Sequence, residues 1–140
     1  MKLTWSRQLS VGNELLDSEH RKIFDLVNEV DSAIRAKDGM RFLEALGILE
    51  KTTRIHFGSE ARIARALDYL FDQHHLEHQY ILNEMRLINV ELTDSQGRWS
   101  ESAAEHFFQF LSTWAIDHID EDDMKMKALL ESVPYDFKPG

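Results

Sequence analysis

The sequence contains no cysteine among its 140 residues and only two prolines. The missing thiols exclude disulfide bonds, cysteine-ligated iron–sulfur clusters, thiolate zinc sites and thiol nucleophiles. Any metal must therefore be held by nitrogen and oxygen ligands. Both prolines, Pro134 and Pro139, lie in the tail, so no proline interrupts a helix before residue 134.

Positive charge and long apolar runs are also scarce. Lys and Arg number 16 against 25 Asp and Glu, which gives a formal net charge of -9. This charge disfavours nucleic acids and anionic membrane surfaces as partners, because their phosphates would be repelled. No stretch approaches the roughly 18 apolar residues of a membrane span, and no signal peptide is evident. We therefore expect a single cytoplasmic domain over residues 1–140, long enough to bury a core.

Apolar residues recur in alternating steps of four and three along four segments, which is helical spacing. These segments cover residues 16–34, 42–67 and 71–92 and a fourth that starts near Ser100 and runs to His118, and they are separated at Gly39, more weakly at 68–70, and at the polar stretch 93–97. Amphipathic helices of about 20 residues with short links predict an all-α fold, an antiparallel up-and-down four-helix bundle. The residues before the first segment are predicted to form an N-terminal arm across the bundle.

Polar residues interrupt the apolar stripes of all four predicted helices. At positions that otherwise hold Leu, Ile, Val or Phe, the stripes carry His20, His56, Glu60, His74, His78 and His118. A lone histidine on an apolar face is usually a core residue whose ring bonds a backbone carbonyl, but five histidines on four helices need another explanation. Burying them without partners would cost about 1–3 kcal/mol for each unsatisfied polar group. A metal bound at the centre of the bundle would satisfy all of them.

Other polar residues have simpler interpretations. The acidic run at 120–123 is either a solvated patch or the source of one further ligand, because His118 lies only one turn earlier. His75 and His106 lie off the stripes and are predicted to be surface residues. Trp114 is either ordinary packing or a wall of the site.

The number of candidate ligands exceeds what a single ion can use. Five imidazoles and two carboxylates suit two ions that share bridging carboxylates, since two six-coordinate ions offer about twelve positions. With a solvent-derived bridge, one position stays open for a small ligand. Nitrogen-rich mixed ligation favours iron over zinc, magnesium and calcium, with copper or manganese as alternatives. Because histidine outnumbers carboxylate, reversible dioxygen binding is favoured over the oxygenation carried out by carboxylate-rich di-iron sites.

Several segments together resemble the bacterial hemerythrins over nearly the whole chain. The matching segments are Trp5 with LSVG (9–12), LDSEHRKIF (16–24), HFGSE (56–60), HHLEH (74–78) and WAIDHIDEDDMKMK (114–127). The resemblance implies an oxo- or hydroxo-bridged, non-haem di-iron centre that binds dioxygen reversibly for storage, delivery or sensing, without substrate turnover.

The resemblance also implies a ligand for each position of the two irons. One iron would be held by His20 and His56, and the other by His74, His78 and His118. The iron with two histidines keeps the open position. Glu60 and an aspartate after His118 would bridge the irons. Helical geometry favours Asp122 for this role, whereas the family pattern falls on Asp123, which we take as the expected ligand.

The sequence departs from the family pattern at three places. Ala61 stands where a second glutamate is common, and the link before His74 is shorter than usual and lacks Tyr-Pro. Ala115 replaces a bulky leucine of the dioxygen pocket, so we expect a roomier, wetter pocket and faster oxidation of the irons. The alternative function is a di-iron enzyme or stress protein that handles peroxide, nitric oxide or iron. Any redox or oxygen-consuming partner would be a separate protein.

Overall fold

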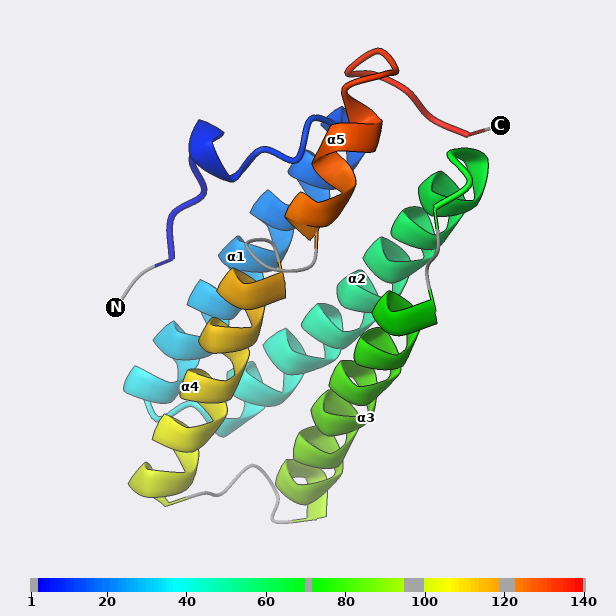
Figure 1. The fold of residues 1–140 in the computed structure, drawn as a ribbon. Coiled ribbons are helices and arrows are strands. Elements are labelled where there is room, and N and C mark those ends of the chain that lie inside the picture. Colours follow the sequence, from blue (N-terminus) through cyan, green and yellow to red (C-terminus); the bar gives the residue numbers. More distant parts are fainter. Residues whose placement is uncertain (1–2, 70–71, 95–99, 119–122, 140) are drawn as a thin grey trace.

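The computed structural model describes residues 3–69, 72–94, 100–118 and 123–139. Regular structure in these residues is entirely helical, and four of the helices are long (Figure 1). The long helices are α1 (Glu14–Arg35), α2 (Gly39–Ala66), α3 (Asp72–Asp94) and α4 (Glu101–Asp117). Shorter turns are η1 (Arg7–Leu9), η3 (Asp123–Met126) and α5 (Lys127–Leu130). The predicted all-α, up-and-down four-helix bundle is confirmed.

Side chains just before three of the long helices cap their N-termini. Asn13, Asp38 and Ser100 each accept a hydrogen bond from a backbone N–H in the first turn of the helix that follows. Such caps satisfy donors that have no partner within the helix. After α1 and α2 the chain turns through left-handed residues, Lys37 with φ 55° and Asp68 with φ 58°. The predicted break at Gly39 therefore falls on the first residue of α2.

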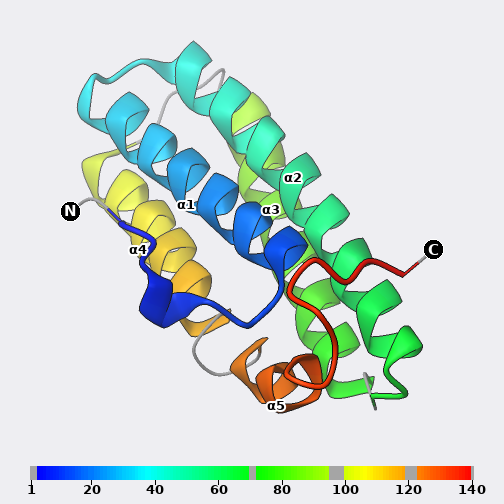
Figure 2. The ribbon, with the colours of Figure 1, turned by 90° about the horizontal axis from the view of Figure 1, so that it is seen from above.

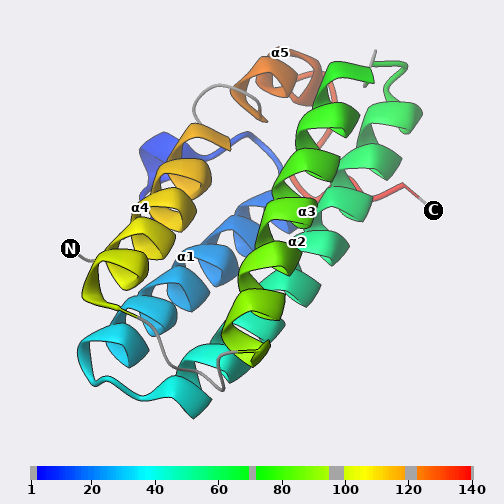
Figure 3. The same cartoon turned by 90° about the horizontal axis from the view of Figure 1, so that it is seen from below.

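Neighbouring helices run antiparallel, and α1 packs most extensively against α2. α2 also packs against α3, and α1 against α4, so the chain order around the bundle is α1, α2, α3, α4. Seen from below, α3 and α4 lie together on one side, with α1 and α2 behind them (Figure 3). No helix of the described residues is long and apolar enough to cross a membrane.

Apolar side chains form the core near the start of α2. Phe42, Leu46 and Leu49 of α2 are fully buried, in steps of four and three. Phe42 meets Phe107 of α4 edge-to-face, with ring centroids 6.3 Å apart. Packing of this kind needs only the apolar pattern of the sequence, and it stabilises the helices by removing hydrocarbon from water.

The N-terminal arm and the C-terminal tail meet at the start of α1, at the other end of the bundle (Figure 2). Asn28 of α1 pairs with the backbone of Leu3 through two hydrogen bonds of 2.7 and 2.8 Å. The carboxylate of Asp17 accepts hydrogen bonds from Val11 N, at 2.9 Å, and from the hydroxyl of Tyr135, at 2.8 Å. Asp17 thus ties the arm and the tail to α1 one turn before His20.

The fourth helix begins at Glu101, close to the predicted start near Ser100. α4 ends at Asp117, and His118 forms its C-terminal cap. After residues 119–122, which lie outside the described part, the chain continues as η3 and then α5. The position of Asp122 relative to His118 therefore falls outside the described residues, and the short α5 was not predicted.

Candidate metal centre

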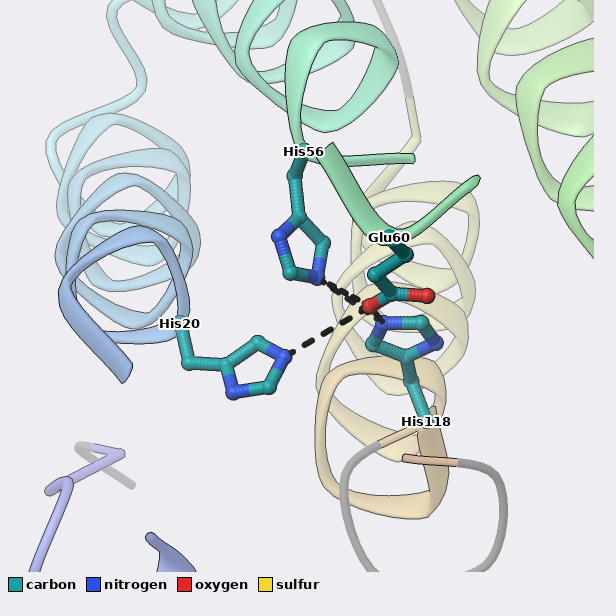
Figure 4. Close-up of side chains that lie close together, drawn as sticks. All are labelled: His20, His56, Glu60 and His118. Carbon is teal, nitrogen blue, oxygen red and sulfur yellow. Dashed lines mark hydrogen bonds and ion pairs between the residues drawn. The ribbon is translucent and has the colours of Figure 1, made fainter. Parts of the chain in front are cut away.

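The four helices bring five of the seven predicted ligands to one buried place. These are His20 from α1, His56 and Glu60 from α2, His78 from α3, and His118 at the end of α4. Each is at most 3% exposed. The imidazoles of three of them point toward the Glu60 carboxylate in Figure 4. Each residue reaches this point because it occupies an inward position of its helix, as the interrupted stripes indicated.

Glu60 lies at the centre of the cluster, and its two oxygens face different histidines. The Oε1 atom is 2.5 Å from His56 Nε2, 2.9 Å from His118 Nε2 and 3.8 Å from His20 Nε2. The Oε2 atom is 3.0 Å from His78 Nε2. The centroid of the His118 ring is 5.3 Å from that of His56 and 5.5 Å from that of His78, so His118 is near histidines on both oxygens. A carboxylate that faces imidazoles on both oxygens has the arrangement that bridging requires.

The electrostatics of this cluster favour a cation at its centre. The Nε2 atoms of His56 and His118 are only 3.1 Å apart, so the space between them holds one proton at most. Ligand atoms of His20, His56, Glu60 and His118 all lie within 4.8 Å of one another. A metal ion would let the imidazole lone pairs and the carboxylate face the same point without repulsion. The donor set is therefore suited to a metal.

The carboxyl group of Glu60 is held in its charged form. Burial by itself would raise its pKa, because a charge is poorly solvated inside the protein. The charges of His118 and His56, and hydrogen bonds from His118 and His20, outweigh burial and lower the pKa well below its ordinary value. An ionised carboxylate is the form that binds metal ions.

A second carboxylate, missed in the sequence, orients one of these histidines. Glu19 Oε1 lies 2.8 Å from His56 Nδ1. Since an ionised carboxylate can only accept, His56 Nδ1 donates, which leaves Nε2 as the nitrogen of this ring that can bind a metal ion. The hydroxyl of Ser59 holds the other oxygen of Glu19 at 2.9 Å. Carboxylates that bond the outer nitrogen of a ligating histidine fix its tautomer and increase its basicity.

Aromatic side chains form a wall on the α3 and α4 side of the cluster. Phe57 stacks on the ring of His78, with a centroid separation of 3.6 Å and an angle of 2°. Trp114 lies 5.6 Å from the His118 ring and meets Phe57 edge-to-face at 6.2 Å. From the sequence, Trp114 could be either a packing residue or a wall of the site. In the structure it packs against Phe57 and also lies beside the His118 ring.

The remaining predicted residues have varied outcomes. His106 is exposed, as predicted. The side chains of His74, His75 and Asp123 and the whole of Asp122 lie outside the described residues. The link before His74 is described only as far as the left-handed Asp68 and the residue after it.

Ala115 is buried, but it is not among the described residues that line the large cavity beside the cluster. That cavity instead reaches His78 and His118 from the side of α3 and α4. The expected widening of a pocket at Ala115 therefore stays a prediction.

Comparisons with known proteins identify the family of this chain. The family model described as "Hemerythrin HHE cation binding domain" matches residues 11–130. A bacteriohemerythrin of Pseudomonas aeruginosa is 24% identical over 121 residues, covering 86% of this chain and 76% of the relative. A bacteriohemerythrin of Clostridium acetobutylicum is 23% identical over 125 residues, covering 85% and 94%. A hemerythrin-like protein of Naegleria gruberi is 25% identical over 126 residues, covering 90% and 92%.

The fold is likewise similar to that of a solved structure. A crystal structure of a mutant hemerythrin superposes with a TM-score of 0.80 at 20% sequence identity. The match covers 91% of this chain and 96% of the other. At this identity the similarity concerns the fold alone.

Proposed function

This chain belongs to the hemerythrin HHE cation-binding family, and we propose that it binds dioxygen reversibly at a non-haem di-iron centre. Its role would then be oxygen storage, delivery or sensing. We take residues 1–140 as one domain of this family. The observation that carries the proposal is the position of Glu60, whose two oxygens face separate imidazoles within a fully buried site.

The proposed ligands are those implied by the sequence. They are His20 and His56 for one iron, His74, His78 and His118 for the other, and Glu60 and Asp123 as bridges. His118 Nε2 faces the same Glu60 oxygen as His56, at 2.9 Å, so its assignment to the iron beside His78 rests on the resemblance alone. His74 belongs to α3, the helix that also carries His78, and Asp123 is the first residue of η3.

Each part of the site would have a separate task. When bound, a pair of ferrous ions supplies the two electrons that reversible dioxygen binding needs. Glu60 supplies negative charge to both ions, and Glu19 holds the His56 ring in the tautomer that presents Nε2. Phe57 covers one face of the His78 ring, and Trp114 packs beside the His118 ring, so both would help to hold these imidazoles in place.

A second function, as a di-iron enzyme that handles peroxide, nitric oxide or iron, is supported by one observation. The cavity between α3 and α4 extends to His78 and His118, so molecules larger than dioxygen have a route toward the cluster. An enzyme would consume its substrate at the irons, whereas an oxygen carrier would return dioxygen unchanged.

Metal analysis combined with optical spectra separates these functions. For an oxygen carrier we expect about two irons per chain and visible charge-transfer bands that bleach on deoxygenation and return with oxygen. Bands that never return, together with consumption of added peroxide, would favour the enzyme. A colourless protein that contains zinc would refute the di-iron centre.

A further inference from the structure

A cavity of about 740 Å³ separates α3 from α4 on one side of the bundle. These two helices lie on the same side in Figure 3, yet their described residues contact each other less than those of α1 and α2 do. The cavity reaches His78 and His118 at its inner end. Its volume is within the range of about 300–1,000 Å³ typical of small-molecule sites and far exceeds the needs of dioxygen. We call this feature the α3–α4 groove.

Large apolar side chains line the groove on both helices. On α3, Leu76 and Tyr80 lie one turn apart and are 64% and 60% exposed. On α4, Phe110 and Trp114 also lie one turn apart and form the opposite wall. Isolated exposed apolar residues are common on protein surfaces, but rings and aliphatic chains that converge on one concave site are typical of ligand pockets. The walls therefore suit a flat, apolar molecule.

The charges of the lining are of one sign. Glu77 and Asp117 both line the groove, and no Lys or Arg is among the described lining residues. In the sequence each carboxylate directly precedes one of the histidines at the inner end, and Asp117 is exposed while Glu77 is half-buried. Such a site repels anions and favours cations or hydrogen-bond donors. Tyr80 and Trp114 add aromatic faces that attract cations.

We propose that the α3–α4 groove binds a small aromatic molecule that carries a cationic or hydrogen-bond-donating group. The ring lies between Tyr80 and Trp114, and the polar group points toward Glu77 and Asp117. This site is separate from the open iron position. The proposal therefore stands whether the centre carries oxygen or acts as an enzyme.

The test uses three naphthalene compounds that share a ring and differ in charge. Titration calorimetry on the iron-loaded protein would measure the binding of 1-naphthylmethylamine, 1-naphthalenemethanol and 1-naphthoate. We expect the amine and the alcohol to bind at one site per chain, with the amine tighter, and the naphthoate to bind at least about tenfold more weakly. Iron content and the visible spectrum, recorded on the same samples, report the state of the metal centre independently.

Two substitutions in the walls locate the site. Thr113 lines the groove and is exposed, so Thr113→Trp fills the groove without disturbing the core. We expect it to weaken amine binding at least about tenfold, because the added ring occupies the space of the ligand. Leu76→Lys should narrow the difference in affinity between the amine and naphthoate, because it offsets one of the two carboxylates of the groove. The control is Leu87→Trp, which adds a ring at an exposed position of α3 outside the groove lining and should leave binding unchanged.

Several results would overturn the proposal. They are equal affinity for naphthoate and the amine, no binding of any compound, or unchanged binding in both wall variants. A doubled mass in solution that falls to that of one chain in Leu76→Lys would also overturn it, because the groove would then be covered by a second copy. Circular dichroism of each variant verifies that the helices are intact, and Leu76→Lys keeps the test decisive if Thr113→Trp does not fold.

Discussion

The two halves of the bundle use the same helical positions for opposite purposes. Along α2, Phe42, Leu46 and Leu49 bury only carbon, whereas His56 and Glu60, which continue the same steps of four and three, bury ionisable groups. The spacing of the stripe determines the helix and its inward face, and the residue type determines what that face does. Burial of the apolar side chains stabilises the fold without a metal. The ionisable side chains of the polar half lose water when they are buried, and a bound cation would offset this cost.

The largest expected effect comes from removing one imidazole of the polar half. His56→Ala should abolish stable oxygen binding, because His56 faces Glu60 at the proposed open iron. Oxygen titration followed by the visible bands measures this. His106→Ala is the matched control, since His106 is exposed, and it should bind oxygen normally. Retained oxygen affinity in His56→Ala would show that the ligand assignment is wrong.

A substitution in the apolar half should change the stability of the fold and leave metal binding intact. Phe42→Ala should lower the free energy of unfolding by about 3–5 kcal/mol, because it leaves a cavity in a fully buried core. Urea denaturation of the iron-free and iron-loaded protein measures the loss in both states. We expect a similar loss in each and normal iron content in the folded protein. An effect seen only with iron bound would contradict the separation of the two halves.

Glu19 tests whether support from outside the cluster matters. Glu19→Gln should weaken iron binding by about 10–100-fold, because the carboxylate that orients His56 Nδ1 becomes a neutral amide. Competition with a chelator measures the affinity. Glu29→Gln is a matched control on the same helix, since Glu29 instead pairs with Arg41 at 2.7 Å. Equal affinities in the two variants would assign Glu19 a purely structural part.

A larger apolar side chain at Ala115 should change how fast the irons oxidise. Ala115→Leu should slow oxidation of the oxygen-bound protein to the ferric form, because a larger side chain beside His118 displaces water from the pocket. The rate is read from the decay of the visible bands in air. A native protein that oxidises no faster than the variant would contradict the expectation drawn from the sequence.

The smallest effect concerns the tail that adjoins the polar half. Burial and the hydrogen bond to Asp17 raise the pKa of Tyr135. The stabilisation from this hydroxyl is therefore complete below the ordinary tyrosine pKa of about 10 and is lost as the pH rises through the higher folded-state value. Urea denaturation between neutral and strongly alkaline pH should show a steeper loss in the native protein than in Tyr135→Phe. Parallel curves would contradict the coupling of Tyr135 to Asp17.

The sequence predicted the features that depend on position within one helix. Helical spacing placed His20, His56, Glu60, His78 and His118 on inward faces, and antiparallel packing then brought these faces together. Glu19 could not be found in this way, because its contact with His56 joins two helices and depends on their relative rotation. The short helix α5 was also missed, because no separate apolar segment was recognised after His118.

The α3–α4 groove was likewise beyond the sequence pattern. Nothing in the sequence distinguishes Leu76 and Tyr80 from isolated apolar residues on a helix surface. They line a groove only because α3 and α4 lie apart at this place. Distances between helices result from the packing of many side chains, which the spacing along one helix does not determine.

The most direct test of the central claim is an anomalous difference map, recorded at the iron absorption edge from crystals of the iron-loaded protein. Two peaks are expected, one on each side of the Glu60 carboxylate. One should lie beside His20 and His56 and the other beside His78. A single peak, or iron bound only elsewhere, would contradict a di-iron centre bridged by Glu60.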